Sequence, residues 1–142
     1  MRIGFAIVTL VGLAGIAASE RPRSVWDGVY TAEQADRGQA RYNELCGSCH
    51  GDTLAGGESA PPLAGGEFLS NWNTLTVGDL FDRTRATMPQ NKPGSLSRET
   101  NADILAYVLR SNQFPPGKET LPLSSPALKE ILIEAVKPDR KE

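Results

Sequence analysis

Histidine and cysteine are scarce in this chain, which has one histidine and two cysteines among its 142 residues. A structural zinc site needs four protein ligands, so a site here would have to recruit at least one carboxylate. Two cysteines form one disulfide at most, which excludes the densely cross-linked scaffolds of many small exported domains. The net charge of -2 and the lack of any basic run exclude a nucleic-acid-binding role.

Aromatic residues are also few, at 6%, whereas there are 14 glycines and 10 prolines. No segment of useful length alternates between apolar and polar residues as a half-buried strand does. The composition therefore predicts an all-α protein with few helices, long loops and a thin apolar core. A bound group would have to complete that core.

Only one long apolar run is present, from Ile3 to Ala18, and it follows the positively charged Arg2. It is shorter than the roughly 20 residues that a membrane-spanning helix needs. Residues 1–18 are therefore predicted to be a secretory signal peptide, cleaved after Ala18 or Ser19, with an uncleaved anchor as the alternative. This predicts export to the periplasm, with no stable membrane span once the signal peptide is removed.

Capping residues and apolar spacing predict four helices after the signal peptide. Thr31 is followed by a capping-box pattern and a proline-free run over 32–45, and Thr76 and Asp79 are placed to cap a short helix that stops before Pro89. Ser97 precedes a long amphipathic segment over 98–112. The tail over 125–138 places apolar residues at helical spacing and predicts a short appended helix: Leu128, Ile131, Leu132, Ala135 and Val136.

The segment "CGSCH" holds both cysteines and the histidine, namely Cys46, Cys49 and His50. Four chemistries suit such a segment: a thiol-disulfide centre, a zinc site with a recruited carboxylate, a local disulfide, and covalent attachment of haem. A thiol-disulfide centre normally follows a strand, whereas here a helix is expected before it. A local disulfide would explain neither the adjacent histidine nor the glycine-rich loops. We therefore favour one haem c, bound by thioethers to both cysteines, with His50 as the proximal iron ligand.

The opposite face of the iron needs a second ligand if the iron is six-coordinate. A single histidine excludes two histidine ligands from one chain. Methionine is the common alternative, and Met88 is the only methionine beyond the predicted signal peptide. It lies in a loop just after a helix and before Pro89, so we expect Met88 to be the distal ligand rather than a core filler.

These residues resemble the class I c-type cytochromes over approximately Tyr30 to Asn112. The similarity lies in "CGSCH", in "PPL" after it, in "TMP", and in the helix segments "GQARY" and "DILAYV". The resemblance implies the class I cytochrome c fold, in which the first and last core helices cross at a glycine and aromatic residues. It places Gly38 and Tyr42 against Ile104 and Tyr107.

The resemblance also implies contacts around the haem. A proline carbonyl would accept a hydrogen bond from the proximal histidine, with Pro61 the better match and Pro62 its rival. Trp72 resembles an indole that contacts a haem propionate, although it fits an ordinary core position equally well. Arg83 and Arg85 suit a propionate too, or a solvated helix surface.

The expected function is single-electron transfer between redox partners by a carrier that is not an enzyme. The alternative is a haem-based peroxidase or gas sensor in which Met88 is displaced. The segment "SVWDGVYTAEQADRGQ" resembles the lead-in of small bacterial cytochromes associated with periplasmic dehydrogenases. Expected partners are therefore such a dehydrogenase and a terminal oxidase or other cytochrome, which a monomer would bind in transient complexes.

The expected organisation is a lead segment over 19–29, a haem domain over 30–112 and an extension over 113–142.

Overall fold

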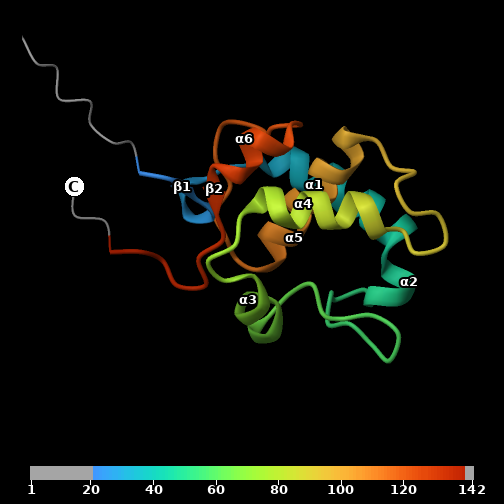
Figure 1. The fold of residues 1–142 in the computed structure, drawn as a ribbon. Coiled ribbons are helices and arrows are strands. Elements are labelled where there is room, and N and C mark those ends of the chain that lie inside the picture. The colour runs from blue at the N-terminus through green and yellow to red at the C-terminus, as the bar shows by residue number, and fades with distance from the viewer. Residues whose placement is uncertain (1–20, 140–142) are drawn as a thin grey trace, which may run out of the picture.

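Helices form most of the regular structure of residues 21–139, the part of the chain that this computed structural model describes (Figure 1). In chain order the elements are β1 (Arg23–Ser24), the 3-10 turn η1 (Val25–Asp27), α1 (Ala32–Leu45), α2 (Gly47–His50), α3 (Gly66–Trp72), α4 (Val77–Thr87), α5 (Arg98–Ser111), α6 (Ser125–Lys129) and β2 (Ile131–Leu132). The predicted all-α class and the class I cytochrome c fold are confirmed. The predicted signal peptide and its cleavage site lie outside these residues. Within 21–139, no helix combines the length and apolar character that crossing a bilayer requires.

The two long helices, α1 and α5, pack against each other (Figure 1), and their closest approach is at Gly38 as predicted. A side chain at Gly38 would overlap the carbonyl oxygen of Asp103 and lie 3.1 Å from the backbone nitrogen of Ile104. One turn further along α1, the rings of Tyr42 and Tyr107 are 5.3 Å apart between centroids. Glycine is required at this crossing because the two backbones are in direct contact.

An ion pair borders the crossing. Arg37 donates two hydrogen bonds to Asp103, each 3.0 Å long, which is the bidentate arrangement that guanidinium and carboxylate groups favour. The side chain of Asp103 is only 8% exposed, so its charge needs this partner. The pair fixes the relative position of α1 and α5 along their line of contact.

Three of the helices begin at the predicted caps. The hydroxyls of Thr31, Thr76 and Ser97 each accept a backbone hydrogen bond from the third residue after them. Both halves of the capping box are present at Thr76, with Asp79 as its partner. At Thr31 only the first half is present, because the side chain of Gln34 is buried and accepts a hydrogen bond from the backbone of Leu121 instead.

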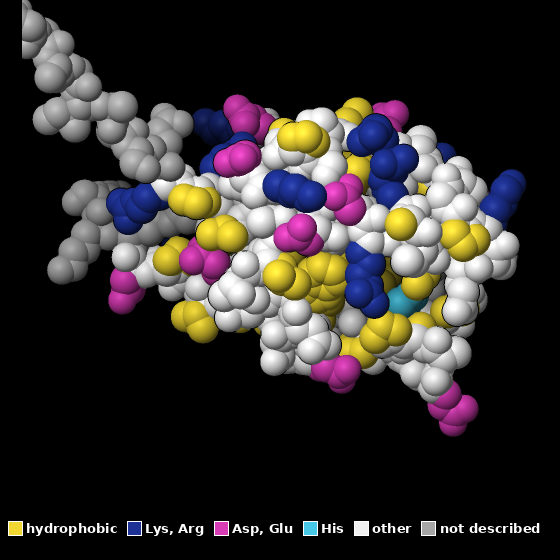
Figure 2. Space-filling model, viewed as in Figure 1, with side chains coloured by type: hydrophobic (Ala, Val, Ile, Leu, Met, Phe, Trp, Pro, Cys, Tyr) yellow, Lys and Arg dark blue, Asp and Glu magenta, His cyan; other side chains and the backbone are white. Residues whose placement is uncertain are grey.

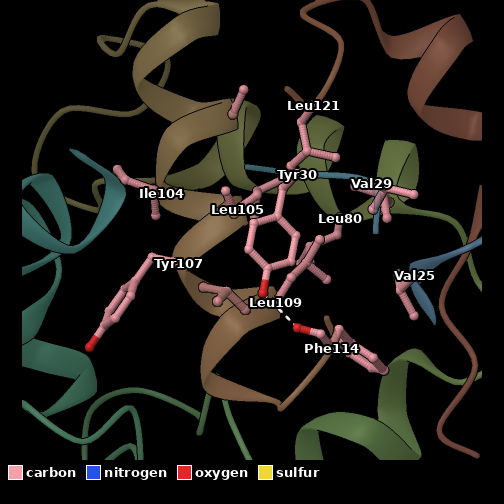
Figure 3. Packing of buried hydrophobic residues seen from close by; sticks show 14 of the residues in the cluster. Val25, Val29, Tyr30, Leu80, Ile104, Leu105, Tyr107, Leu109, Phe114 and Leu121 are labelled. Atoms are coloured by element: carbon pink, nitrogen blue, oxygen red, sulfur yellow. Dashed lines mark hydrogen bonds between the residues drawn. The ribbon is translucent and has the colours of Figure 1, made fainter. Parts of the chain in front are cut away.

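The apolar core is larger than the composition predicts. Twenty-two apolar residues of the described part are buried in one cluster, to which residues outside the long helices also contribute, among them Val25, Val29, Leu121 and Ile133. Figure 3 shows Tyr30 within this cluster, with its hydroxyl donating to the carbonyl of Phe114 at 2.5 Å. The segments before α1 and after α5 therefore complete a core that the long helices alone would leave open.

The predicted helix in the tail is shorter than its apolar spacing indicates. It ends at Lys129, and Ile131–Leu132 pairs in parallel with Arg23–Ser24. Ile131 and Ile133 are buried, whereas Val136, which belonged to the expected helical stripe, is 80% exposed. Isoleucines two residues apart also suit an extended segment, and pairing with backbone groups elsewhere in the fold decides between the two.

Candidate functional site

A cavity of about 510 Å³ is lined by the predicted haem anchors, both predicted iron ligands and the proline predicted to contact the proximal histidine. Cys46, Cys49, His50, Pro61 and Met88 line it. Its apolar lining comes from α1, α4, α5 and the loop between α2 and α3: Leu45, Leu63, Leu80, Ile104, Leu105 and Val108. Figure 2 shows the histidine side chain in a hollow among hydrophobic side chains. The fold thus brings Met88 to the same cavity as Cys46, which lies 42 positions earlier in the sequence.

The two cysteines lie on one helical turn. The amides of Cys49 and His50 both donate to the carbonyl of Cys46, at 3.1 and 3.0 Å, so the three side chains are held by the same turn. Both thiols are free in the structure. Burial, with a smaller contribution from Cys49, raises the pKa of the Cys46 thiol to about 11. A thiol-disulfide centre needs a lowered thiol pKa instead, so the environment of Cys46 argues against that chemistry.

His50 is buried and oriented by one backbone group. Its Nδ1 lies 2.8 Å from the carbonyl oxygen of Pro61, the proline predicted in preference to Pro62. A carbonyl oxygen only accepts hydrogen bonds, so Nδ1 carries the proton in this contact. In the neutral imidazole this contact leaves Nε2 as the nitrogen with a free lone pair, and that nitrogen can bind a metal.

The loop that carries Pro61 is tied down at several points. The hydroxyl of Tyr42 donates to the carbonyl of Gly51 at 2.7 Å, and the amide of Leu63 donates to the carbonyl of Leu54 at 2.8 Å. Burial is the main cause that raises the pKa of Tyr42, so its hydroxyl stays protonated as a donor at neutral pH. The carbonyl that orients His50 thus belongs to an ordered loop.

Asn112 holds this loop from the end of α5, a role that the sequence reasoning missed. Its side-chain oxygen accepts from the amide of Gly65 at 3.0 Å, and its amide nitrogen donates to Leu63 at 3.0 Å and to Val108 at 2.9 Å. An asparagine at a helix end is common. Nothing in its local sequence indicates a partner 47 or 49 residues away.

We expect Asn112→Ala to lower the free energy of unfolding by about 1 to 3 kcal/mol, because two part-buried hydrogen bonds to the loop are lost at about 0.5 to 1.5 kcal/mol each. It should also raise the reduction potential, since a looser Pro61 carbonyl weakens the donor strength of His50. Urea unfolding and a redox titration measure the two effects. The exposed Asn43→Ala is the control, and equal results for the two variants would contradict the role of Asn112.

Met88 follows directly after α4. Its amide donates to the carbonyl of Thr84 at 2.9 Å, and its half-buried side chain lines the same cavity as His50. The position of Met88 is therefore determined by the end of α4, just as that of His50 is determined by α2 and Pro61.

Trp72, Arg83 and Arg85 are not among the residues that line this cavity in the described part of the chain. Trp72 is partly buried, with its ring centroid 6.2 Å from that of Phe68. Arg85 lies over the ring of Phe81, and Arg83 is exposed. A contact from Trp72 to a propionate stays a prediction, and its observed role is packing.

The cavity fits a haem in chemistry and in size. Its volume lies within the range of about 300 to 1,000 Å³ that is usual for cofactor sites, and its walls are largely apolar. Two free thiols on one turn suit covalent attachment, and the imidazole of His50, oriented by Pro61, suits iron. Met88, which lines the same cavity, supplies a thioether sulfur.

Comparison with known proteins agrees with this geometry. Residues 33–108 match the family model described as cytochrome c oxidase, cbb3-type, subunit III. Among solved structures, the chain is similar in fold to the sulfane dehydrogenase SoxCD from Paracoccus pantotrophus, with 24% sequence identity and a TM-score of 0.50. The match covers 75% of this chain but only 61% of that one. The search of curated proteins finds no match.

Proposed function

Because the chain belongs to the family described as cytochrome c oxidase, cbb3-type, subunit III, and is a c-type cytochrome with covalently bound haem c, we propose that it carries single electrons between redox partners. In this proposal His50 and Met88 are the iron ligands, and Cys46 and Cys49 are the haem anchors. Residues 30–112 are the haem-binding unit. The observation that carries the proposal is that one apolar cavity is lined by all four side chains.

When bound, haem c supplies an iron that alternates between Fe(II) and Fe(III). The protein's residues hold its surroundings constant. Pro61 fixes the orientation of His50, the end of α4 fixes Met88, and the apolar walls exclude water. A site with two ligands supplied by the chain leaves no position for a substrate. Cys49 is exposed, so the edge that it anchors is the part of the site nearest to a docked partner.

A peroxidase or gas sensor in which Met88 is displaced is less well supported. A peroxidase needs an acid-base side chain on the distal side. The polar residues that line the cavity around Met88 are Thr84, Gln90 and Asn91, and none of them is a carboxylate or a histidine. Among the described residues that line the cavity the only carboxylate is that of Glu44, which is exposed and paired with Arg41. The residues that line the cavity therefore suit an electron carrier better than a peroxidase.

Met88→Ala should convert the haem to a high-spin or ligand-exchangeable form, because the distal sulfur is removed and the iron gains an open position. The ferric methionine-to-iron charge-transfer band should disappear, and carbon monoxide should bind rapidly to the reduced variant but slowly to the wild type. Gln90→Ala, which changes an exposed residue of the same cavity, is the control. An unchanged charge-transfer band would rule out Met88, and rapid carbon monoxide binding by the wild type would favour the sensor.

The proposal extends to location and partners. We place the protein in the periplasm, because the N-terminal apolar run has the form of a signal peptide. The electron donor that we propose is a periplasmic dehydrogenase, supported by the lead-in segment and by the fold shared with SoxCD, whose name includes a dehydrogenase. A terminal oxidase or another cytochrome would be the acceptor. Recovery of the haem protein in a periplasmic extract, and its reduction by dehydrogenases there, would test both points.

A further inference from the structure

The helix that precedes Met88, α4, is held in place largely by the segment that follows α5. In the described part of the chain α4 packs against α6 more extensively than against α5 (Figure 1). The segment Leu121–Ile133, which we call the tail brace, is itself attached to α1, because the amide of Leu121 donates to the buried side chain of Gln34 at 2.8 Å. The tail brace therefore connects α4 to the crossed pair of long helices.

The contact between α6 and the first turn of α4 depends on Gly78. A Cβ atom at this position would lie 2.7 Å from the backbone nitrogen of Lys129 and 3.0 Å from the carbonyl carbon of Leu128. Both neighbours are backbone atoms, so they could not rotate away. The absence of a side chain at Gly78 allows the backbone of α6 to lie directly on α4.

A second contact lies further along α4, at Asp82. One of its oxygens accepts a hydrogen bond from the Ser125 hydroxyl at 2.7 Å and pairs with the Lys129 ammonium group at 3.3 Å. The ion pair alone would contribute little, because both side chains are nearly half exposed. The hydrogen bond from the Ser125 hydroxyl to the charged Asp82 carboxylate adds a directional contact, also from α6.

The start of α4 is held by the strand of the tail brace. The amide of Ile133 donates to the carbonyl of Leu75, and the amide of Thr74 donates to the carbonyl of Ile133, each at 2.8 Å. Thr76, the cap of α4, also forms a bridge with Leu132. The tail brace thus contacts α4 before its first turn, in its first turn and near its middle.

We propose that the tail brace positions Met88, so that its contacts with α4 determine how firmly the distal sulfur stays on the iron. This rests on the proposed role of Met88 as distal ligand. Met88 lies six residues after Asp82 as the C-cap of the same helix, and a rigid helix transmits a shift at Asp82 to its end. Asp82, Gly78 and Ser125 are therefore positioning residues for the iron site.

The test uses full-length holoprotein and measures the rate of carbon monoxide binding to the reduced form, together with the ferric charge-transfer band. The Asp82 side chain is nearly half exposed, so loss of its contacts removes the net contribution of about one ordinary hydrogen bond. Asp82→Ala should therefore accelerate carbon monoxide binding about three- to tenfold. Asp82→Asn retains an acceptor for Ser125 and should fall between Asp82→Ala and the wild type. Gly78→Ala should act in the same direction as Asp82→Ala. If Gly78→Ala fails to fold, the two Asp82 variants still test whether the tail brace positions Met88.

The matched control is Asp36→Ala, which removes the ion pair between Asp36 and Arg110 on the two long helices and leaves α4 untouched. It should bind carbon monoxide at the wild-type rate. If the wild type shows the charge-transfer band and the Asp82 variants match the control, the positioning role is overturned and Met88 remains the ligand. If the wild type lacks the band, Met88 is not the ligand and both proposals are overturned.

Discussion

The double variant Cys46→Ala, Cys49→Ala is expected to contain no haem and to lose most of its helical circular dichroism. Without thioethers the haem has no covalent attachment, and the apolar walls of the cavity then face water instead of packing against the porphyrin. Full burial of one such side chain contributes about 1.5 to 3 kcal/mol. Loss of part of this contribution at several side chains is comparable to the whole stability of a domain, about 5 to 15 kcal/mol. Binding of the haem is therefore coupled to folding.

Circular dichroism and haem staining of a denaturing gel together check this expectation. Ser48→Ala is the matched control, because Ser48 is exposed and lies on the same turn between the two cysteines. It should retain covalent haem and the native spectrum. A double variant without haem that keeps the native helical spectrum would show that the 22 buried apolar residues stabilise the fold without the cofactor.

Gly38→Ala is expected to lower the free energy of unfolding by roughly 3 kcal/mol or more, the upper end of the usual cost of overpacking. The added methyl group would lie 2.5 Å from the carbonyl carbon of Asp103 and overlap its oxygen. These are backbone atoms of α5, so no change of rotamer relieves the overlap and the two long helices must separate. Separation would also disturb the contact between Tyr42 and Tyr107 and the ion pair at Asp103.

Urea unfolding of the holoprotein measures this effect. Gly66→Ala is the control, because a Cβ atom at Gly66 meets no atom within 4 Å and its residue begins α3. The urea concentration at the midpoint of unfolding should be equal to or slightly higher than that of the wild type for this control. Equal midpoints for the two variants would show that the helices do not approach as closely in solution as Gly38 requires.

The helices were the most predictable part of the fold. Caps at Thr31, Thr76 and Ser97 act within their own turn, so a local pattern is enough to identify them. The tail was less predictable, because its isoleucines suit a helix and an extended segment equally well. Its outcome depends on backbone partners near Arg23 and Leu75, which lie far away in the sequence.

The candidate site divides in the same way. The sequence by itself determined the cofactor chemistry, since Cys46, Cys49 and His50 occur on one turn and a single methionine follows the predicted signal peptide. Only the tertiary structure decided how that site is supported. Asn112 reaches the loop after Pro61, and the tail brace reaches α4, across more than 40 residues of sequence in each case. The physical reason is that a motif describes groups fixed by neighbouring backbone, whereas hydrogen bonds between distant segments exist only once the chain has folded.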